Sequence, residues 1–119
     1  MTPLQFRRIA LGHDGVVEGA HMGHADFRAA NGRIFASLTE DEKRGTAKLT
    51  PDQQADFVDP APKAFIPAAG AWGRQGWTTI VLKDADQEML GEALTLAWQS
   101  INAAKPARKR PKTRKSAKS

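Results

Sequence analysis

The chain has 119 residues, 40% of them hydrophobic, which suits one domain with a single core. It contains no cysteine, so a disulfide scaffold, a thiolate metal site and a thiol nucleophile are excluded. The formal net charge is +5, and the lack of both a membrane-length apolar run and a signal-peptide pattern predicts a soluble, cytoplasmic protein without a membrane partner.

The first predicted elements are a helix and a short strand. Thr2-Pro3 starts the helix, because threonine is a good N-cap and proline suits the first helical turn. An apolar stripe continues to Leu11, and Gly12 ends the helix. A first strand is expected from Glu18 to Met22.

A β-hairpin gives the clearest local pattern. The runs 24–30 and 33–38 flank Asn31-Gly32, which predicts a type I′ turn with positive φ at both central residues. A two-residue loop fixes the register, so Arg28 is expected opposite Phe35.

This register sorts the hairpin side chains onto two faces. The face covered by the core is predicted to have Ala25, Phe27, Ala29, Ile34, Ala36 and Leu38. The solvated face is predicted to have His24, Asp26, Arg28, Arg33, Phe35 and Ser37. Phe35 is therefore an aromatic side chain expected on the open face, either partly covered by its neighbours or available to a partner.

Alternating and helical periods continue through the rest of the body. The elements predicted there are a charged loop at 39–45, a strand at 46–49, a helix at 51–58, a strand at 64–66, a loop at 68–76, a strand at 77–82 and a last helix. Asp84 is expected to cap the last helix, whose apolar positions from Met89 to Ile101 share one face and cover the sheet. Because strands and helices are segregated, the sequence predicts an α+β fold, an antiparallel sheet covered on one face by helices.

Residues 105–119 form a basic tail. The tail has two prolines, no acidic residue and no large apolar side chain, so it is expected to be disordered and distinct from a domain over 1–104. Its eight cations are Lys105, Arg108, Lys109, Arg110, Lys112, Arg114, Lys115 and Lys118. The body holds ten basic and thirteen acidic residues, a net charge of −3. The tail suits a polyanion such as DNA, RNA or an acidic protein surface, or is a solubilising appendage without a target.

Few residues of the body point to a specific chemistry. His21, His24 and Asp26 are spaced like metal ligands, but His21 lies beyond Gly23 at an undefined orientation and no further ligand is close in sequence. The acidic residues at 40–42 are interpreted as part of a solvated loop. The sequence therefore predicts no metal, no cofactor and no catalytic residue.

The glycine-rich segment 70–76 lacks the strand-then-helix context of a phosphate-binding loop. Within it, Trp72 and Arg74 are residue types that stack on a base or bind a phosphate. A tryptophan between small residues more often packs on the core, so we interpret Trp72 as a core anchor and leave the role of Arg74 open.

Several short segments together resemble the YjbR-like (MmcQ) family. In order they are residues 6–11 (FRRIAL), 15–18 (GVVE), 21–28 (HMGHADFR), 32–36 (GRIFA), 48–54 (KLTPDQQ), 73–76 (GRQG), 93–94 (AL) and 97–98 (AW). No single motif is specific, but the collinear set is. The resemblance covers about residues 4–103 and leaves the tail outside.

The resemblance implies a small α+β domain similar to the frataxin-like fold, in agreement with the order of the predicted elements. Members of the family are commonly labelled DNA-binding, because their exposed hairpin-like elements look like a double-wing motif. The family has no established catalytic residues to transfer to this chain. Ala25 stands where a proline is usual, so the entry into the hairpin is expected to be less rigid here.

The leading hypothesis is a non-enzymatic protein that contacts DNA or RNA with little sequence preference. The tail is expected to provide most of the contacts, with help from Arg28, Arg33 and Arg74 of the body. The alternative is a protein-interaction or self-association module, which would use the open sheet face near Phe35 or a free strand edge.

Overall fold

The computed structural model describes residues 1–103, which fold into four α-helices and six strands. In chain order the elements are α1 (Pro3–Leu11), β1 (Val17–His21), β2 (His24–Arg28), β3 (Ile34–Leu38), β4 (Arg44–Lys48), α2 (Pro51–Val58), β5 (Phe65–Pro67), α3 (Gly70–Arg74), β6 (Trp77–Val81) and α4 (Gln87–Ala103). A short 3₁₀ turn, η1 (Leu82–Asp84), joins β6 to α4. The predicted tail at 105–119 lies outside the described residues.

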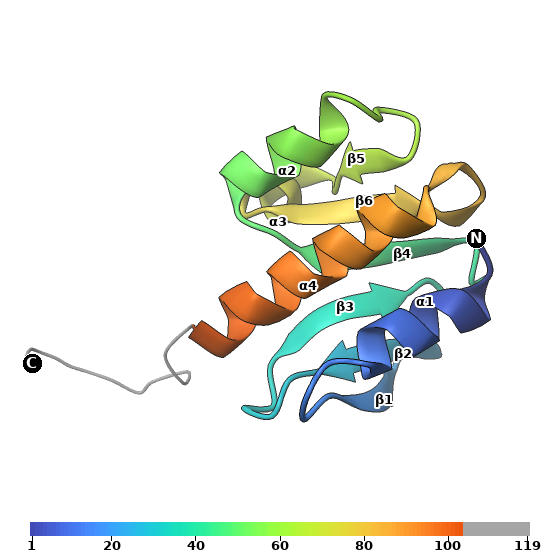
Figure 1. Cartoon of the computed structure of the whole chain (residues 1–119), viewed down its shortest axis with the longest axis vertical. Coiled ribbons are helices and arrows are strands. Elements are labelled where there is room, and N and C mark those ends of the chain that lie inside the picture. Colours follow the sequence, from blue (N-terminus) through green and yellow to red (C-terminus); the bar gives the residue numbers. More distant parts are fainter. Residues whose placement is uncertain (104–119) are drawn as a thin grey trace, which may run out of the picture.

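The strands form one antiparallel sheet in the order β1-β2-β3-β4-β6-β5. Figure 1 shows α4 crossing the sheet, with α1 and α2 on either side of it on the same face. This arrangement confirms the predicted α+β fold and the role of the last helix as a cover for the sheet. Within residues 1–103, no helix has the length and apolar character needed to cross a bilayer.

The starts of α1 and α2 follow from one repeated local signal. The Thr2 hydroxyl accepts a hydrogen bond from the Gln5 backbone N–H at 3.1 Å, and the Gln5 side chain accepts one from the Thr2 N–H at 2.8 Å. Thr50 and Gln53 form the same reciprocal pair at the start of α2. Each helix has a proline in its first turn, so both predicted starts are confirmed.

Two local predictions around the last strands are wrong. The cap of α4 is Asp86, whose carboxylate accepts from the Met89 N–H at 3.1 Å, whereas Asp84 closes the preceding 3₁₀ turn. The segment at 68–76 is not all loop, because residues 70–74 form the one-turn helix α3. Both errors arise where a single turn of helix lacks the length to produce a periodic pattern.

The core lies between the sheet and the helices. Its largest fully buried side chains are Phe6, Phe27, Phe35, Phe65, Leu38, Leu49, Ile80, Leu90, Leu94 and Thr78. Leu90, Ala93, Leu94 and Ala97 form the buried stripe of α4, as its apolar period predicts. In β6, Thr78 and Ile80 are buried while their neighbours in the strand are half-buried, which confirms the predicted alternation.

The hairpin between β2 and β3 closes differently from the prediction. The Ala29 N–H donates to the Arg33 carbonyl and the Gly32 N–H donates to the Ala29 carbonyl, so the loop has three residues rather than two. Gly32 has a φ of 84°, whereas Asn31 is not among the described residues with positive φ. This is the geometry of a type I turn followed by a left-handed glycine, and it shifts the register by one residue.

A β-bulge next to the loop restores the register. Arg28 pairs with Ile34, but the next pair along the strands is Phe27 with Ala36, so Phe35 is the extra residue. Phe35 is turned into the core and is fully buried, and Ile34 takes the place beside Arg28 on the open face. The predicted placement of Phe35 on the open face is therefore wrong, because a two-residue loop was assumed.

A candidate nucleic-acid interface at one end of the sheet

The strand directions gather four basic residues at one end of the sheet. β2 and β4 both end where β3 and β6 begin, because each neighbouring pair is antiparallel. This end therefore includes Arg28 at the end of β2, Arg33 just before β3 and Lys48 at the end of β4. Arg74, at the end of α3 just before β6, lies at the same end (Figure 1). We call these four residues the basic end.

Arg28 is held by a buried carboxylate. Its Nε and Nη2 donate to the two oxygens of Asp26 at 2.9 and 3.2 Å, and Asp26 is only 2% exposed. These hydrogen bonds raise the pKa of Arg28 above its ordinary value. A Cβ at Gly19 would lie 2.9 Å from Asp26 Oδ1, so the absence of a side chain on β1 makes room for the pair. Asp26 thus balances the charge of Arg28.

Arg33 follows the hairpin loop, and its guanidinium is incompletely satisfied. Its Nε is buried and has no hydrogen-bond partner within residues 1–103. A buried charged donor without a partner is unusual in a folded protein. The Asn31 amide of the same loop donates to the Ile101 carbonyl at 3.0 Å, in the last turn of α4. The last turn of α4 therefore lies beside the hairpin loop that Arg33 follows.

Lys48 and Arg74 complete the basic end. The Lys48 ammonium donates to the Gln75 carbonyl at 2.7 Å, and burial lowers the pKa of Lys48 below its ordinary value. Arg74 is exposed. The structure thus brings together Arg28, Arg33 and Arg74, the three body residues predicted to contact a polyanion, and adds Lys48, which the sequence did not single out.

Trp72 is exposed, so its interpretation as a core anchor is wrong. The side chain is 64% exposed, and its ring meets Trp77 nearly edge to face, with centroids 6.5 Å apart. The residue of α3 that packs inward is Gly73, where a Cβ would lie only 1.9 Å from the Ala68 carbonyl oxygen. Adjacent residues of a helix point about 100° apart, so the inward position of Gly73 turns Trp72 outward.

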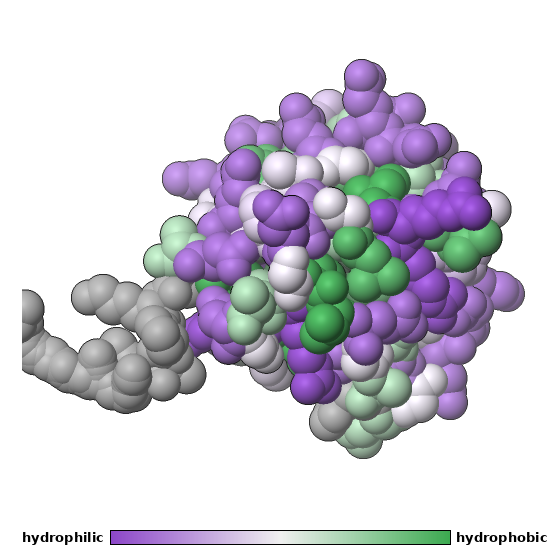
Figure 2. Space-filling model, turned by 60° about the horizontal axis from the view of Figure 1, so that its bottom comes forward, coloured by the Kyte–Doolittle hydropathy of each residue, from purple (hydrophilic) through white to green (hydrophobic). Residues whose placement is uncertain are grey.

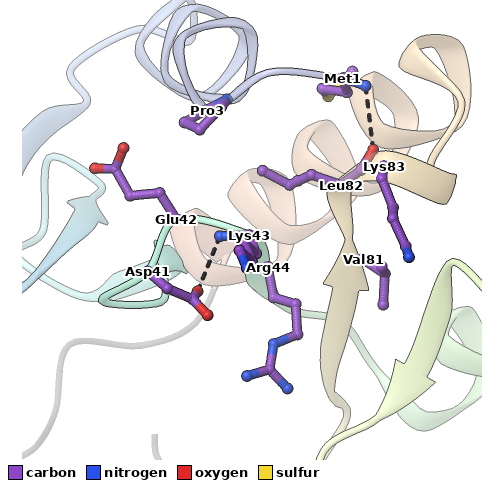
Figure 3. A pocket seen from close by; sticks show the side chains of 9 residues that line it. All are labelled: Met1, Pro3, Asp41, Glu42, Lys43, Arg44, Val81, Leu82 and Lys83. Carbon is purple, nitrogen blue, oxygen red and sulfur yellow. Dashed lines mark hydrogen bonds between the residues drawn. The ribbon is translucent and has the colours of Figure 1, made fainter.

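The opposite end of the sheet has a group of acidic residues and a cleft (Figure 3). The acidic side chains there are Glu40, Asp41, Glu42, Asp84 and Asp86. The cleft has a volume of about 710 Å³ and is lined by Met1, Pro3, Asp41, Glu42, Lys43, Arg44, Val81, Leu82 and Lys83. Asp41 accepts from the Lys43 N–H and the Thr39 hydroxyl, and Glu42 pairs with Arg7. The Lys43, Arg44 and Lys83 side chains form no ion pair within the described residues.

Arg7 ties α1 to this wall of the cleft, and its loss is expected to change stability in a pH-dependent way. Its Nη2 donates to Glu42 at 2.7 Å, which lowers the pKa of Glu42 from its ordinary value of 4.5. The stabilisation is fully present above about pH 4.5 and is lost as the pH falls through the lower pKa of folded Glu42. In thermal melts, Arg7→Gln should lower the midpoint near neutral pH, and the gap to wild type should narrow in acid.

Arg8, exposed on the same helix, provides the control for this experiment. Arg8→Gln should give a small difference from wild type that does not change over the same pH range. A gap for Arg7→Gln that stays constant from neutral pH to acid would contradict the assigned role of Glu42.

A hydrophobic surface lies on the α1 and β1 side of the molecule. Leu4 and Leu11 are seven residues apart in α1, so they share a face, and they are 55% and 41% exposed. Val17, at the start of β1, is also exposed. Figure 2 turns the α1 and β1 side of the molecule forward and shows hydrophobic side chains gathered there within a largely hydrophilic surface. We call Leu4, Leu11 and Val17 the apolar side.

Comparison with known proteins agrees with the architecture. None of the curated proteins compared with the chain matches it. Among solved structures, the Deinococcus radiodurans protein DR2400, with a DUF419 domain, is similar with a TM-score of 0.71 and 20% sequence identity. The match covers 86% of this chain and 82% of that one, and at this identity it shows a shared fold. The family model named YjbR matches residues 11–100. The chain therefore belongs to the YjbR family.

Proposed function

We propose that this protein is a cytoplasmic, non-enzymatic nucleic-acid-binding protein that contacts DNA or RNA with little sequence preference. The observation that supports this most is the hydrogen bond from Asn31 to the Ile101 carbonyl. Through it, α4 ends at the basic end, so the eight cations of residues 105–119 follow directly from the place where the body has its own arginines.

The charge distribution assigns most of the affinity to the tail. The body has a net charge of −3, and Asp26 balances Arg28, so the body alone attracts a polyanion weakly. Lys and Arg side chains that meet phosphates position a protein without reading bases, which accounts for the low sequence preference. The acidic residues at the opposite end of the sheet disfavour binding there and so orient the domain on a polyanion.

Salt dependence tests this proposal with the full chain and a labelled duplex of arbitrary sequence. If all eight tail cations meet phosphates, the slope of log K against log salt should be about −7. Replacing the eight cations with glutamine should remove most of the affinity and reduce the slope to that of the few body contacts. Fluorescence anisotropy over a series of salt concentrations measures both quantities.

The matched control replaces cations that lie away from the basic end. Lys43, Lys63 and Lys83 are exposed, and their joint replacement with glutamine lowers the net charge without touching the proposed interface. This variant should keep nearly the full slope. An unchanged affinity of the glutamine-tail variant, or no binding by the full chain at low salt, would refute the proposal.

A second candidate function, protein interaction or self-association, is favoured by one observation. The exposed leucines of α1 and Val17 form an apolar side of the kind that proteins use to bind other proteins. Phe35 is not part of such a surface, because it is buried. A dimer mass in light scattering that persists at high salt, and that Leu4→Ser with Leu11→Ser abolishes, would favour this function.

A further inference from the structure

We infer that the nucleic acid bound at the basic end is single-stranded, and that Trp72 stacks on one of its unpaired bases. This inference rests on the proposed function and adds the class of nucleic acid to it. It starts from Trp72, a large aromatic side chain that is 64% exposed although the next residue of α3, Gly73, is buried.

Trp72 is supported from below as a rigid platform. Its ring contacts that of Trp77 at an interplanar angle of 77°, and Trp77 is half-buried at the start of β6. The Gln54 amide donates to the Gly73 carbonyl at 3.1 Å and to the Trp77 carbonyl at 3.0 Å, so one side chain joins α3 to β6. A ring held in this way loses little conformational entropy when a second aromatic group stacks on it.

Two cations lie close to this platform in the fold. Lys48 pairs with Trp77 in the register of β4 and β6, and its ammonium reaches the Gln75 carbonyl at 2.7 Å. Arg74 is exposed in the same short helix as Trp72. An aromatic ring between basic side chains is the combination that binds single strands, in which the cations meet phosphates and the ring meets a base.

The shape of the site favours a single strand over a duplex. In a duplex the bases are stacked inside, and reading them from the major groove requires a helix or a β-ribbon that enters it. α3 has only five residues, and its exposed aromatic side chain is an indole, which offers a flat face rather than hydrogen bonds to base edges. Stacking accepts every base, which fits the low sequence preference of the proposed function.

The experiment compares a single-stranded oligonucleotide with a duplex of equal phosphate number, each titrated into the full chain at one salt concentration. Trp72→Ala should weaken single-strand binding by roughly 5- to 150-fold and leave duplex binding nearly unchanged. Trp72→Phe should retain most of the single-strand affinity but lose the quenching of tryptophan fluorescence that accompanies stacking. DNA and RNA versions of the strand show which sugar is preferred.

The controls separate the stacking role from charge and from folding. Leu4→Ala removes an exposed apolar side chain on the apolar side and should leave both affinities unchanged. Circular dichroism melts should show that the Trp72 variants fold. If Trp72→Ala weakens both polymers equally, or neither, the inference is wrong while the proposed function stands. If the wild-type chain binds neither polymer, both are wrong.

Discussion

Replacing Gly76 with alanine is expected to destabilise the domain by about 3–5 kcal/mol, a large part of the stability of a domain of this size. Gly76 has a φ of 106°, a conformation that an L-residue adopts only with strain. A Cβ there would also lie 1.8 Å from the Leu49 carbonyl oxygen, where β4 passes α3. The obstacle is backbone, and the Leu49 N–H donates to the Gly76 carbonyl at 3.1 Å, so neither side can move away without losing this bond.

Substitutions at two other glycines distinguish the cost of a steric clash from the cost of a positive φ. Gly32→Ala places an alanine at a positive φ, but its Cβ would have no atom within 4 Å, so the substitution should cost only about 1–2 kcal/mol of stability. Gly91→Ala meets nothing within 4 Å in the middle of α4 and should stabilise the domain by about 0.5–1 kcal/mol. Urea unfolding of the three variants measures the series. Similar losses of stability for Gly76→Ala and Gly32→Ala would show that the close approach of the Leu49 carbonyl to Gly76 is unimportant.

Phe35→Ala is expected to cost about 3–5 kcal/mol, as for the removal of any large aromatic side chain from a core. Phe35 is fully buried, and its ring meets the His13 ring edge to face with centroids 6.4 Å apart. If the side chain were on the open face, as the regular hairpin predicts, the same substitution would change stability by less than about 0.5 kcal/mol. The measured loss therefore tests the β-bulge itself.

Val17→Ala is a suitable comparison for Phe35→Ala. Val17 lies on the edge strand β1 and is 58% exposed, so its truncation should stay within about 0.5 kcal/mol of wild type. Chemical denaturation with both variants gives the two values. Equal, small losses for the two residues would mean that Phe35 is not turned into the core.

The features that sequence reasoning predicted well are determined by residues close together in the chain. The threonine, proline and glutamine that start α1 and α2 satisfy the backbone within one turn, so their pattern is sufficient. Likewise, the three-turn apolar stripe of α4 and the alternation in β6 reflect a whole element facing one core. The α+β architecture follows from these elements and their segregation.

What could not be predicted depends on single residues or on distant contacts. The extra loop residue shifts the pairing of β2 with β3 by one residue, and the bulge at Phe35 shifts it back. Between these two points, Ile34 and Phe35 lie on the opposite faces from those predicted. The exposure of Trp72 depends on how Gly73 packs against Ala68, and no periodic pattern reports such a contact. For the candidate interface, the arginines could be named from the sequence. Their position at one end of the sheet depends on the directions of the strands, which the sequence does not report. The ion pair with Asp26, which offsets the charge of Arg28, is also visible only in the structure.

The hydrogen bond between Asn31 and Ile101 has a consequence for the proposed function, because it would let two weak sets of cations act on one polymer. Because the described part of α4 ends beside the basic end, a polyanion bound by either set would be held at a high effective concentration for the other. Linkage of this kind raises avidity by about 100- to 10,000-fold without any new contact. Under the proposed function, an acidic domain with few free arginines of its own would thereby serve as one arm of a bivalent binder.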